Sequence, residues 1–202
     1  FGVDAFVIRH SENEYYKNLN LSVPLLNAGD GTHAHPTQCL LDLLTIYQEY
    51  GSFEGLKVCF VGDIKFSRVA HEGIQTMERL GMECYVSGPN IYMEDDYKFI
   101  ELDQAVTEMD VIVLLRVQNE RHSDGDHVDK SSYLAKYGMT LERAQKMKKG
   151  AIIMHPAPFN RGIEIQDEVL DLPQTRIFKQ MKNGVFVRQA VLKRSLEECF
   201  IL

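Results

Sequence analysis

The residues best suited to chemistry in this sequence lie in one glycine-containing turn, residues 27–38. An apolar run at residues 23–26 comes before the turn and predicts a buried strand, and an amphipathic run after Pro36 predicts a helix. The free N–H groups and the dipole of a helix N-terminus favour negative charge. His35 and Gln38 at this position could therefore hold an anionic or strongly polarised ligand.

Arginines mark the ends of other predicted strands. Arg9, Arg68 and Arg116 each come at or shortly after such an end. Ligands of open α/β sheets bind at the carboxyl ends of the strands, so these side chains are expected to converge. The planar guanidinium of Arg116 suits a carboxylate, although an internal ion pair is a serious alternative. Arg68 and its neighbour Lys65 could equally be solvated surface charges.

A fourth polar segment, His-Pro-Ala-Pro at residues 155–158, follows the last predicted strand. Its two prolines stiffen the backbone, so the carbonyl groups between them form a rim that suits an amide NH₂ group. A simple chain reversal is the alternative. Residues 122–129 are polar and contain glycine, which predicts a mobile loop that could act as a lid, and their spacing matches no ordered metal site.

The composition is that of an ordinary globular protein. The 202 residues are 45% hydrophobic and 25% charged, and the net charge of −7 argues against nucleic-acid binding. No apolar run is long enough for a membrane span. The cysteines form no C-x-x-C pair, so buried free thiols are expected rather than a zinc or redox site. They are Cys39, Cys59, Cys84 and Cys199.

Strands and helices alternate regularly along the chain, which predicts an α/β fold with parallel sheets flanked by helices. The expected strands are residues 5–8, 23–26, 56–63, 83–87, 110–115 and 151–154. The expected helices are residues 36–50, 69–80, 102–109, 141–149 and 185–202. Ser11 and Glu14 resemble a capping box that opens a short helix to Leu19. Residues 51–55 break the first long helix and predict a domain hinge.

Taken together, these motifs resemble those of the aspartate carbamoyltransferase family, within the aspartate/ornithine carbamoyltransferase superfamily. The resemblance extends from the first residues to about residue 188. The Arg-Val-Gln-x-x-Arg and His-Pro-Ala-Pro motifs are unlike those of ornithine carbamoyltransferases. The matching segments are Val7-Ile8-Arg9-His10, Asn27-Ala28-Gly29-Asp30-Gly31, His35-Pro36-Thr37-Gln38, Gly62-Asp63-Ile64-Lys65, Ser67-Arg68, Leu115-Arg116-Val117-Gln118-Asn119-Glu120-Arg121, Met154-His155-Pro156-Ala157-Pro158, Asn160-Arg161-Gly162 and Asn183-Gly184-Val185-Phe186-Val187-Arg188.

The resemblance implies transfer of a carbamoyl group from carbamoyl phosphate to the α-amino group of L-aspartate, a step of pyrimidine synthesis. It implies no metal or cofactor, a cytoplasmic location and a homotrimer with shared sites. By similarity, the residues expected to contact carbamoyl phosphate are Arg9, His35, Gln38, Ala157 and Pro158. The residues expected to hold L-aspartate are Arg68, Arg116 and Gln118. Arg9 and His35 would also stabilise the charge that develops on the carbonyl oxygen.

Two features of the family are absent from the sequence: a phosphate-binding Ser-Thr-Arg-Thr turn and a lysine-bearing loop that reaches a neighbouring site. Ala34, where relatives often have Gln, is a lesser departure. We expect an N-terminal portion to be missing, and little or no activity if these residues are the whole protein. The expected parts are an incomplete carbamoyl-phosphate domain at 1–52, an aspartate domain at 53–183 and a terminal helix at 184–202 that packs on the first. A different amino acceptor, such as ornithine, and an inactive fragment are the alternatives.

Overall fold

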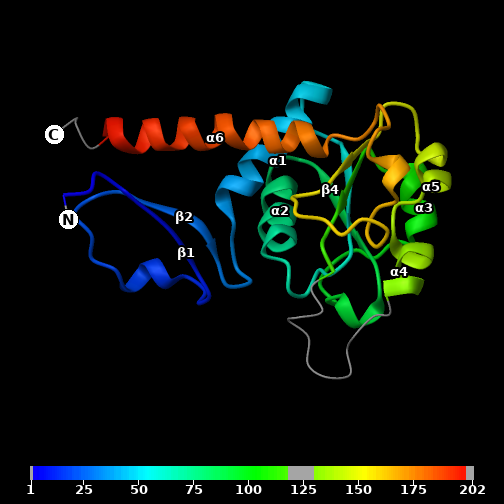
Figure 1. Ribbon diagram of the computed structural model, residues 1–202, viewed down its shortest axis with the longest axis horizontal. Coiled ribbons are helices and arrows are strands. Elements are labelled where there is room, and N and C mark those ends of the chain that lie inside the picture. The colour runs from blue at the N-terminus through cyan, green and yellow to red at the C-terminus, as the bar shows by residue number, and fades with distance from the viewer. Residues whose placement is uncertain (1, 118–129, 199–202) are drawn as a thin grey trace.

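The computed structural model describes residues 2–117 and 130–198, and a four-stranded parallel sheet lies at its centre (Figure 1). In order across the sheet, the strands are β4 (Glu83–Ser87), β3 (Lys57–Val61), β5 (Val111–Leu114) and β6 (Ile152–Met154). All three pairings are parallel and in register, with Val58 opposite both Cys84 and Val111. The predicted parallel sheet is confirmed.

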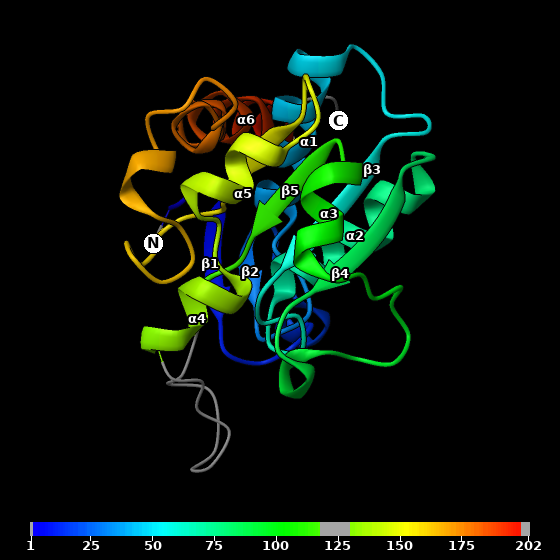
Figure 2. The same cartoon turned by 90° about the vertical axis from the view of Figure 1, so that its right-hand side faces the viewer.

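Helices cover both faces of this sheet. They are α1 (Pro36–Tyr50), α2 (Arg68–Arg79), α3 (Leu102–Glu108) and α5 (Leu141–Lys146). Side chains alternate along β3, so Phe60 packs with Ile46 of α1 and Ile74 of α2, whereas Val61 packs with Val106 of α3. Figure 2 shows α3 and α5 in front of the sheet and α1 and α2 behind it. Because both faces are buried, the central strands are apolar apart from Lys57, the first residue of β3.

A second, smaller parallel sheet pairs β1 (Phe6–His10) with β2 (Leu25–Asp30), to the left of the central sheet in Figure 1. A short 3₁₀ helix, Tyr15–Asn18, lies between the two strands. Strand β2 runs four residues past the predicted end, so the first part of the expected turn is strand.

The predicted capping box at Ser11–Glu14 is wrong. Glu14 lies in the left-handed region at φ 52°, and its side chain caps nothing. Its backbone N–H instead donates to the buried carboxylate of Asp30 over 2.7 Å. A contact between residues distant in sequence thus replaces the local hydrogen bond that the motif predicts.

The long C-terminal helix, α6 (Ile177–Glu198), passes over α1 and extends above β1 and β2 (Figure 1). It begins eight residues before the predicted start. The prediction missed this first part because Gln180 and Asn183 interrupt the apolar periodicity, although both are buried. Both side chains bond to α1: Gln180 Nε2 donates to Asp42 over 2.8 Å and Asn183 Nδ2 to Thr45 over 2.9 Å. The boundary expected at 183/184 falls inside this continuous helix.

One helix was not predicted, α4 (Lys130–Tyr137). Arg143 of α5 closes its C-terminal end, since its Nη1 donates to Gly138 O over 2.8 Å and its Nη2 to Lys136 O over 3.1 Å. Two further 3₁₀ turns lie at Asn90–Tyr92 and Asp167–Val169.

The three cysteines within the described residues, Cys39, Cys59 and Cys84, are buried free thiols, as predicted. Burial raises the pKa of Cys39 and of Cys84 to about 12, so both are protonated at neutral pH. Cys199 lies outside the described residues. None of the helices in residues 2–117 and 130–198 has the length and apolar character needed to cross a lipid bilayer.

Candidate active site

A cavity of about 160 Å³ lies at the carboxyl ends of β3, β5 and β6, where α1 and α2 begin. It is lined by Arg9, His35, Gln38, Phe66, Ser67, Arg68, Val69, Leu115, Arg116, His155, Pro156, Ala157 and Pro158. Seven of the eight residues expected from the sequence are among them. The eighth, Gln118, lies outside the described residues. The fold thus brings together in one cavity side chains that come from five separate segments.

His35 enters the cavity from the N-cap position of α1. Its backbone N–H donates to the carboxylate of Glu72, and its buried Nδ1 has no hydrogen-bond partner among the described residues. Burial, together with the positive charges of Arg68 and Arg9, lowers the pKa of His35 to about 4. At neutral pH the imidazole is therefore uncharged, with one N–H to donate.

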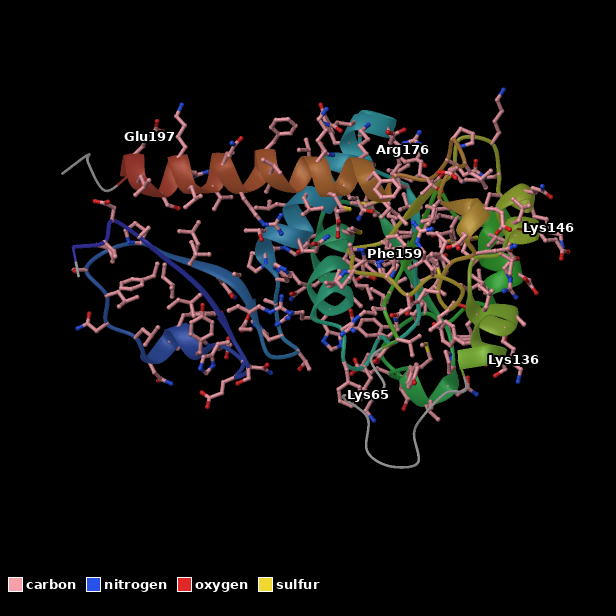
Figure 3. All side chains as sticks on the ribbon, in the orientation of Figure 1. Lys65, Lys136, Lys146, Phe159, Arg176 and Glu197 are labelled. Atoms are coloured by element: carbon pink, nitrogen blue, oxygen red, sulfur yellow. The ribbon has the colours of Figure 1, made fainter. Side chains whose placement is uncertain are left out.

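Arg68 is the first residue of α2 and is held in place by its surroundings. Ser67 caps the helix, accepting from Ala70 N over 3.2 Å. The guanidinium donates from Nη1 to Gly31 O over 3.1 Å, and Arg68 is only 7% exposed. It is therefore not a solvated surface charge. Lys65 is one, since its side chain lies on the surface of the molecule (Figure 3).

Arg116 follows the buried strand β5 directly, as the sequence predicts, and is half-buried at the cavity wall. The chain beside it is anchored by the buried carboxylate of Glu164. That carboxylate accepts from Val117 N over 2.8 Å and from Asn160 Nδ2 over 2.8 Å. Glu164 thus joins the segment after β5 to the turn after residue 158, two neighbouring walls of the cavity.

The backbone of residues 155–158 forms the rim opposite α1, with Ala157 in the left-handed region at φ 51°. Ala157 N donates to His155 Nδ1 over 3.0 Å, so the proton of neutral His155 lies on Nε2. Burial, together with the charge of Arg116, lowers the pKa of His155 to about 3. His155 was not among the individual site residues expected from the sequence, although its position directly after β6 could have indicated it.

A buried carboxylate, Asp42, supports the cavity from behind. Gln38 Nε2 donates to Asp42 Oδ1 over 2.9 Å, and Gln180 Nε2 donates to the same oxygen over 2.8 Å. Gln180 Oε1 in turn accepts from His155 N over 2.8 Å. Asp42 and Gln180 were not predicted from the sequence. The four-residue spacing of Gln38 and Asp42 on one helix face could have suggested the first, but nothing local points to the second.

The arrangement favours binding of anionic small molecules. Three arginines and two uncharged histidines surround the cavity. Within residues 2–117 and 130–198, no three His, Cys, Asp or Glu side chains gather as they would around a metal ion. The fold and the site together define an α/β protein whose cavity at the sheet edge is built to hold multiply charged anions.

Comparison with known proteins identifies the family. Residues 54–194 match the Asp/Orn binding domain of aspartate/ornithine carbamoyltransferase, and residues 1–48 match its carbamoyl-P binding domain. The chain belongs to the aspartate/ornithine carbamoyltransferase family.

Curated relatives agree. The chain is 50% identical to the aspartate carbamoyltransferase catalytic subunit of Limosilactobacillus reuteri, with 96% of this chain and 66% of that one aligned. It is 47% identical to the corresponding subunit of Fusobacterium nucleatum, with 98% of this chain and again 66% of the relative aligned. The chain therefore spans just under two thirds of these relatives.

Solved structures show the same fold. Aspartate transcarbamoylase from Trypanosoma cruzi in complex with N-(phosphonacetyl)-L-aspartic acid superposes with a TM-score of 0.83 at 31% identity, covering 94% of this chain and 65% of that one. Ornithine carbamoyltransferase from Thermus thermophilus superposes with a TM-score of 0.79 at 23% identity, over 96% and 67% of the two chains. This second likeness speaks for the fold alone.

Proposed function

We propose that this protein transfers the carbamoyl group of carbamoyl phosphate to the α-amino group of L-aspartate, giving N-carbamoyl-L-aspartate and phosphate in pyrimidine biosynthesis. The observation that carries the proposal is the single cavity in which Arg9, His35, Gln38, Arg68 and Arg116 meet. It is also supported by the two curated relatives, which are aspartate carbamoyltransferase catalytic subunits.

L-Aspartate brings two carboxylates, and the cavity offers two guanidinium groups, Arg68 and Arg116, on walls from different strands. Each planar fork can hold one carboxylate bidentately. Gln118 belongs to the same proposed set by similarity. L-Ornithine has a second amine in place of the second carboxylate, and this ammonium group would lie beside the positively charged guanidinium.

Carbamoyl phosphate would bind on the side of Arg9, His35 and Gln38. Attack of the amine builds negative charge on the carbonyl oxygen, and donors fixed before the reaction stabilise this charge. His35 can donate while uncharged, and Arg9 adds a positive charge. The rim carbonyls at Ala157 and Pro158 would accept from the carbamoyl NH₂ group.

The reaction forms a C–N bond and breaks the C–O bond to phosphate, and the attacking amine loses a proton. A histidine with a pKa of about 4 is a weak base at neutral pH, so His35 is not the proton acceptor in this proposal. The departing phosphate, which is more basic, takes the proton. The protein contributes charge stabilisation and the alignment of two charged substrates.

By family resemblance we also propose that the protein works in the cytoplasm as a homotrimer with sites shared between subunits. A mass measurement of the assembly in solution tests this, and a monomer that turns over substrate would contradict it. A homotrimer of these 202 residues contains neither the phosphate-binding turn nor the lysine loop, so both would have to be supplied by chain outside these residues.

The function is tested by supplying carbamoyl phosphate with L-aspartate or with L-ornithine and measuring the carbamoylated product. We expect Arg116→Ala to raise KM for aspartate about 10- to 100-fold, the effect of one charged hydrogen-bonded pair. We expect His35→Ala to lower kcat roughly 100-fold, as for one lost oxyanion donor. Arg161→Ala, at an exposed position outside the cavity, is the matched control.

Two outcomes would contradict the proposal. One is turnover with a different amine and none with L-aspartate. The other is unchanged kinetics in both cavity variants. If the protein turns over nothing, calorimetric titration with L-aspartate and with carbamoyl phosphate separates an inactive binder from a protein that recognises neither.

A further inference from the structure

The geometry points to Asp42 as a positioning residue of the cavity, whose carboxylate turns the side-chain amide of Gln38 so that the amide oxygen faces the ligand. The ligand group that meets this oxygen is the carbamoyl NH₂, so in this respect the inference rests on the proposed function. Asp42 itself does not line the cavity and acts only through other side chains.

The orientation follows from hydrogen-bonding capacity. An ionised carboxylate only accepts, whereas a glutamine amide has one donating and one accepting end. Gln38 is 5% exposed and Asp42 is 2% exposed, one helical turn apart on α1. Gln38 Nε2 faces Asp42 Oδ1 at 2.9 Å, so its Oε1 is left to point elsewhere. Gln38 therefore presents its Oε1 to the cavity as a hydrogen-bond acceptor, which an NH₂ group of a ligand can donate to.

Asp42 orients a second amide in the same way. Gln180 of α6 donates from Nε2 to the same Oδ1 over 2.8 Å, and its Oε1 accepts from His155 N over 2.8 Å. One carboxylate oxygen thus joins the wall from α1 to the rim that follows β6. Both surfaces proposed to accept from the carbamoyl NH₂, the Gln38 amide and the rim carbonyls, depend on this buried group.

The protonation state of Asp42 should control the orientation of the Gln38 and Gln180 side-chain amides. Burial raises the pKa of Asp42 to about 7, against the hydrogen bonds from Gln180 and Gln38 and the charge of Arg188 on α6. The other titratable groups nearby are the Cys39 thiol on α1 and His155, which is linked to Asp42 through Gln180. A protonated Asp42 can donate to an amide oxygen and lets either glutamine reverse. The preferred orientation is therefore held above about pH 7 and released below it.

A ligand-free measurement tests this directly. We would follow the ¹⁵N and ¹H signals of the Gln38 and Gln180 side-chain amides from about pH 5.5 to about pH 8.5, a range that brackets the raised pKa. We expect both amides to shift with one shared midpoint near pH 7 in the unaltered protein. We expect the shift to vanish in Asp42→Asn and to persist in Asp171→Asn, which removes the same charge at an exposed position. Amides that do not titrate, or titrate equally in Asp42→Asn, would overturn the inference.

Kinetics supply the second test. We expect Asp42→Asn to raise KM for carbamoyl phosphate about 3- to 10-fold, the effect of one misdirected hydrogen bond, and to remove the pH dependence of kcat/KM near 7. A merely structural role would lower activity without moving the pH profile. The two proposals fail separately: a protein without carbamoyl transfer would still show the amide titration, and the unaltered protein gives that result even if Asp42→Asn does not fold.

Discussion

Replacing Glu49 by Gln should loosen the attachment of α6 to α1, the helix that carries His35, Gln38 and Asp42. The Glu49 carboxylate bonds to Arg176 in a fork, with Nε–Oε1 at 2.7 Å and Nη2–Oε2 at 2.8 Å. Lys179 adds a third contact at 2.5 Å. Arg176 directly precedes α6, and Figure 3 shows its side chain at the start of that helix.

The magnitude follows from the shifted pKa. The hydrogen bond from Arg176, opposed by burial and aided by Lys179, lowers the pKa of Glu49 from 4.5 to about 2. At about 1.4 kcal/mol per unit this is about 3.5 kcal/mol. The side chains of Arg176 and Lys179 are 24% and 36% exposed, so solvent screening reduces the figure to roughly 1–2 kcal/mol. For a protein of this size the melting temperature should fall by roughly 3–6 °C.

The assay is urea unfolding of both proteins at a series of pH values. A carboxyl whose pKa is depressed by folding contributes its full stability above the unfolded value, about 4.5, and loses it as the pH falls toward about 2. The difference in the free energy of unfolding between the unaltered protein and Glu49→Gln should therefore be largest at neutral pH and should decrease below about pH 4.5. A difference in unfolding free energy under about 0.3 kcal/mol at pH 7, or one that does not change with pH, would refute the reasoning.

Two further substitutions have matched controls. Gly29 has a φ of 115°, which strains any residue with a Cβ, and the Cβ of Gly29→Ala would lie 3.1 Å from the Arg68 guanidinium. We therefore expect roughly 2–3 kcal/mol of destabilisation and weaker aspartate binding. Gly51→Ala, at φ 72° with nothing within 4 Å of the new Cβ, should cost about 1 kcal/mol and leave binding alone, and equal effects would contradict the role of Arg68. Arg143→Leu removes the donors to the last carbonyls of α4 and should cost roughly 2–3 kcal/mol in urea unfolding. Arg161→Leu removes only an exposed ion pair and should change stability by less than about 0.5 kcal/mol.

Elements with strong local signals could be predicted closely. Helix α1 begins at Pro36 and ends before Gly51, whose positive φ and N–H bond to Tyr47 O close the helix. The apolar run of β5 predicts a strand buried on both faces and an arginine emerging at its end. The candidate cavity could be predicted for the same reason, since strand ends in a parallel sheet share one edge.

What the sequence could not show depends on contacts between distant residues. Strand β2 continues past Gly29 to Asp30, whose buried carboxylate accepts from Asn27, from Glu14 N and from His33. Burial acts to raise the pKa of Asp30, but these hydrogen bonds outweigh it and the net shift is downward. Helix α6 was predicted to start too late for a similar reason, because its buried polar residues face partners on α1 that no local pattern reveals.

The electrostatics of the cavity connect the fold to the proposed chemistry. Its arginines share a small volume with His35 and His155, and the positive charges, added to burial, keep both imidazoles neutral. Protonation of either histidine would add a further cation beside Arg68 or Arg116. A neutral imidazole avoids this repulsion and still donates one hydrogen bond. Among the described residues that line the cavity, the positive charge therefore comes from guanidinium groups, and the carboxylates and phosphate of the proposed substrates would balance it.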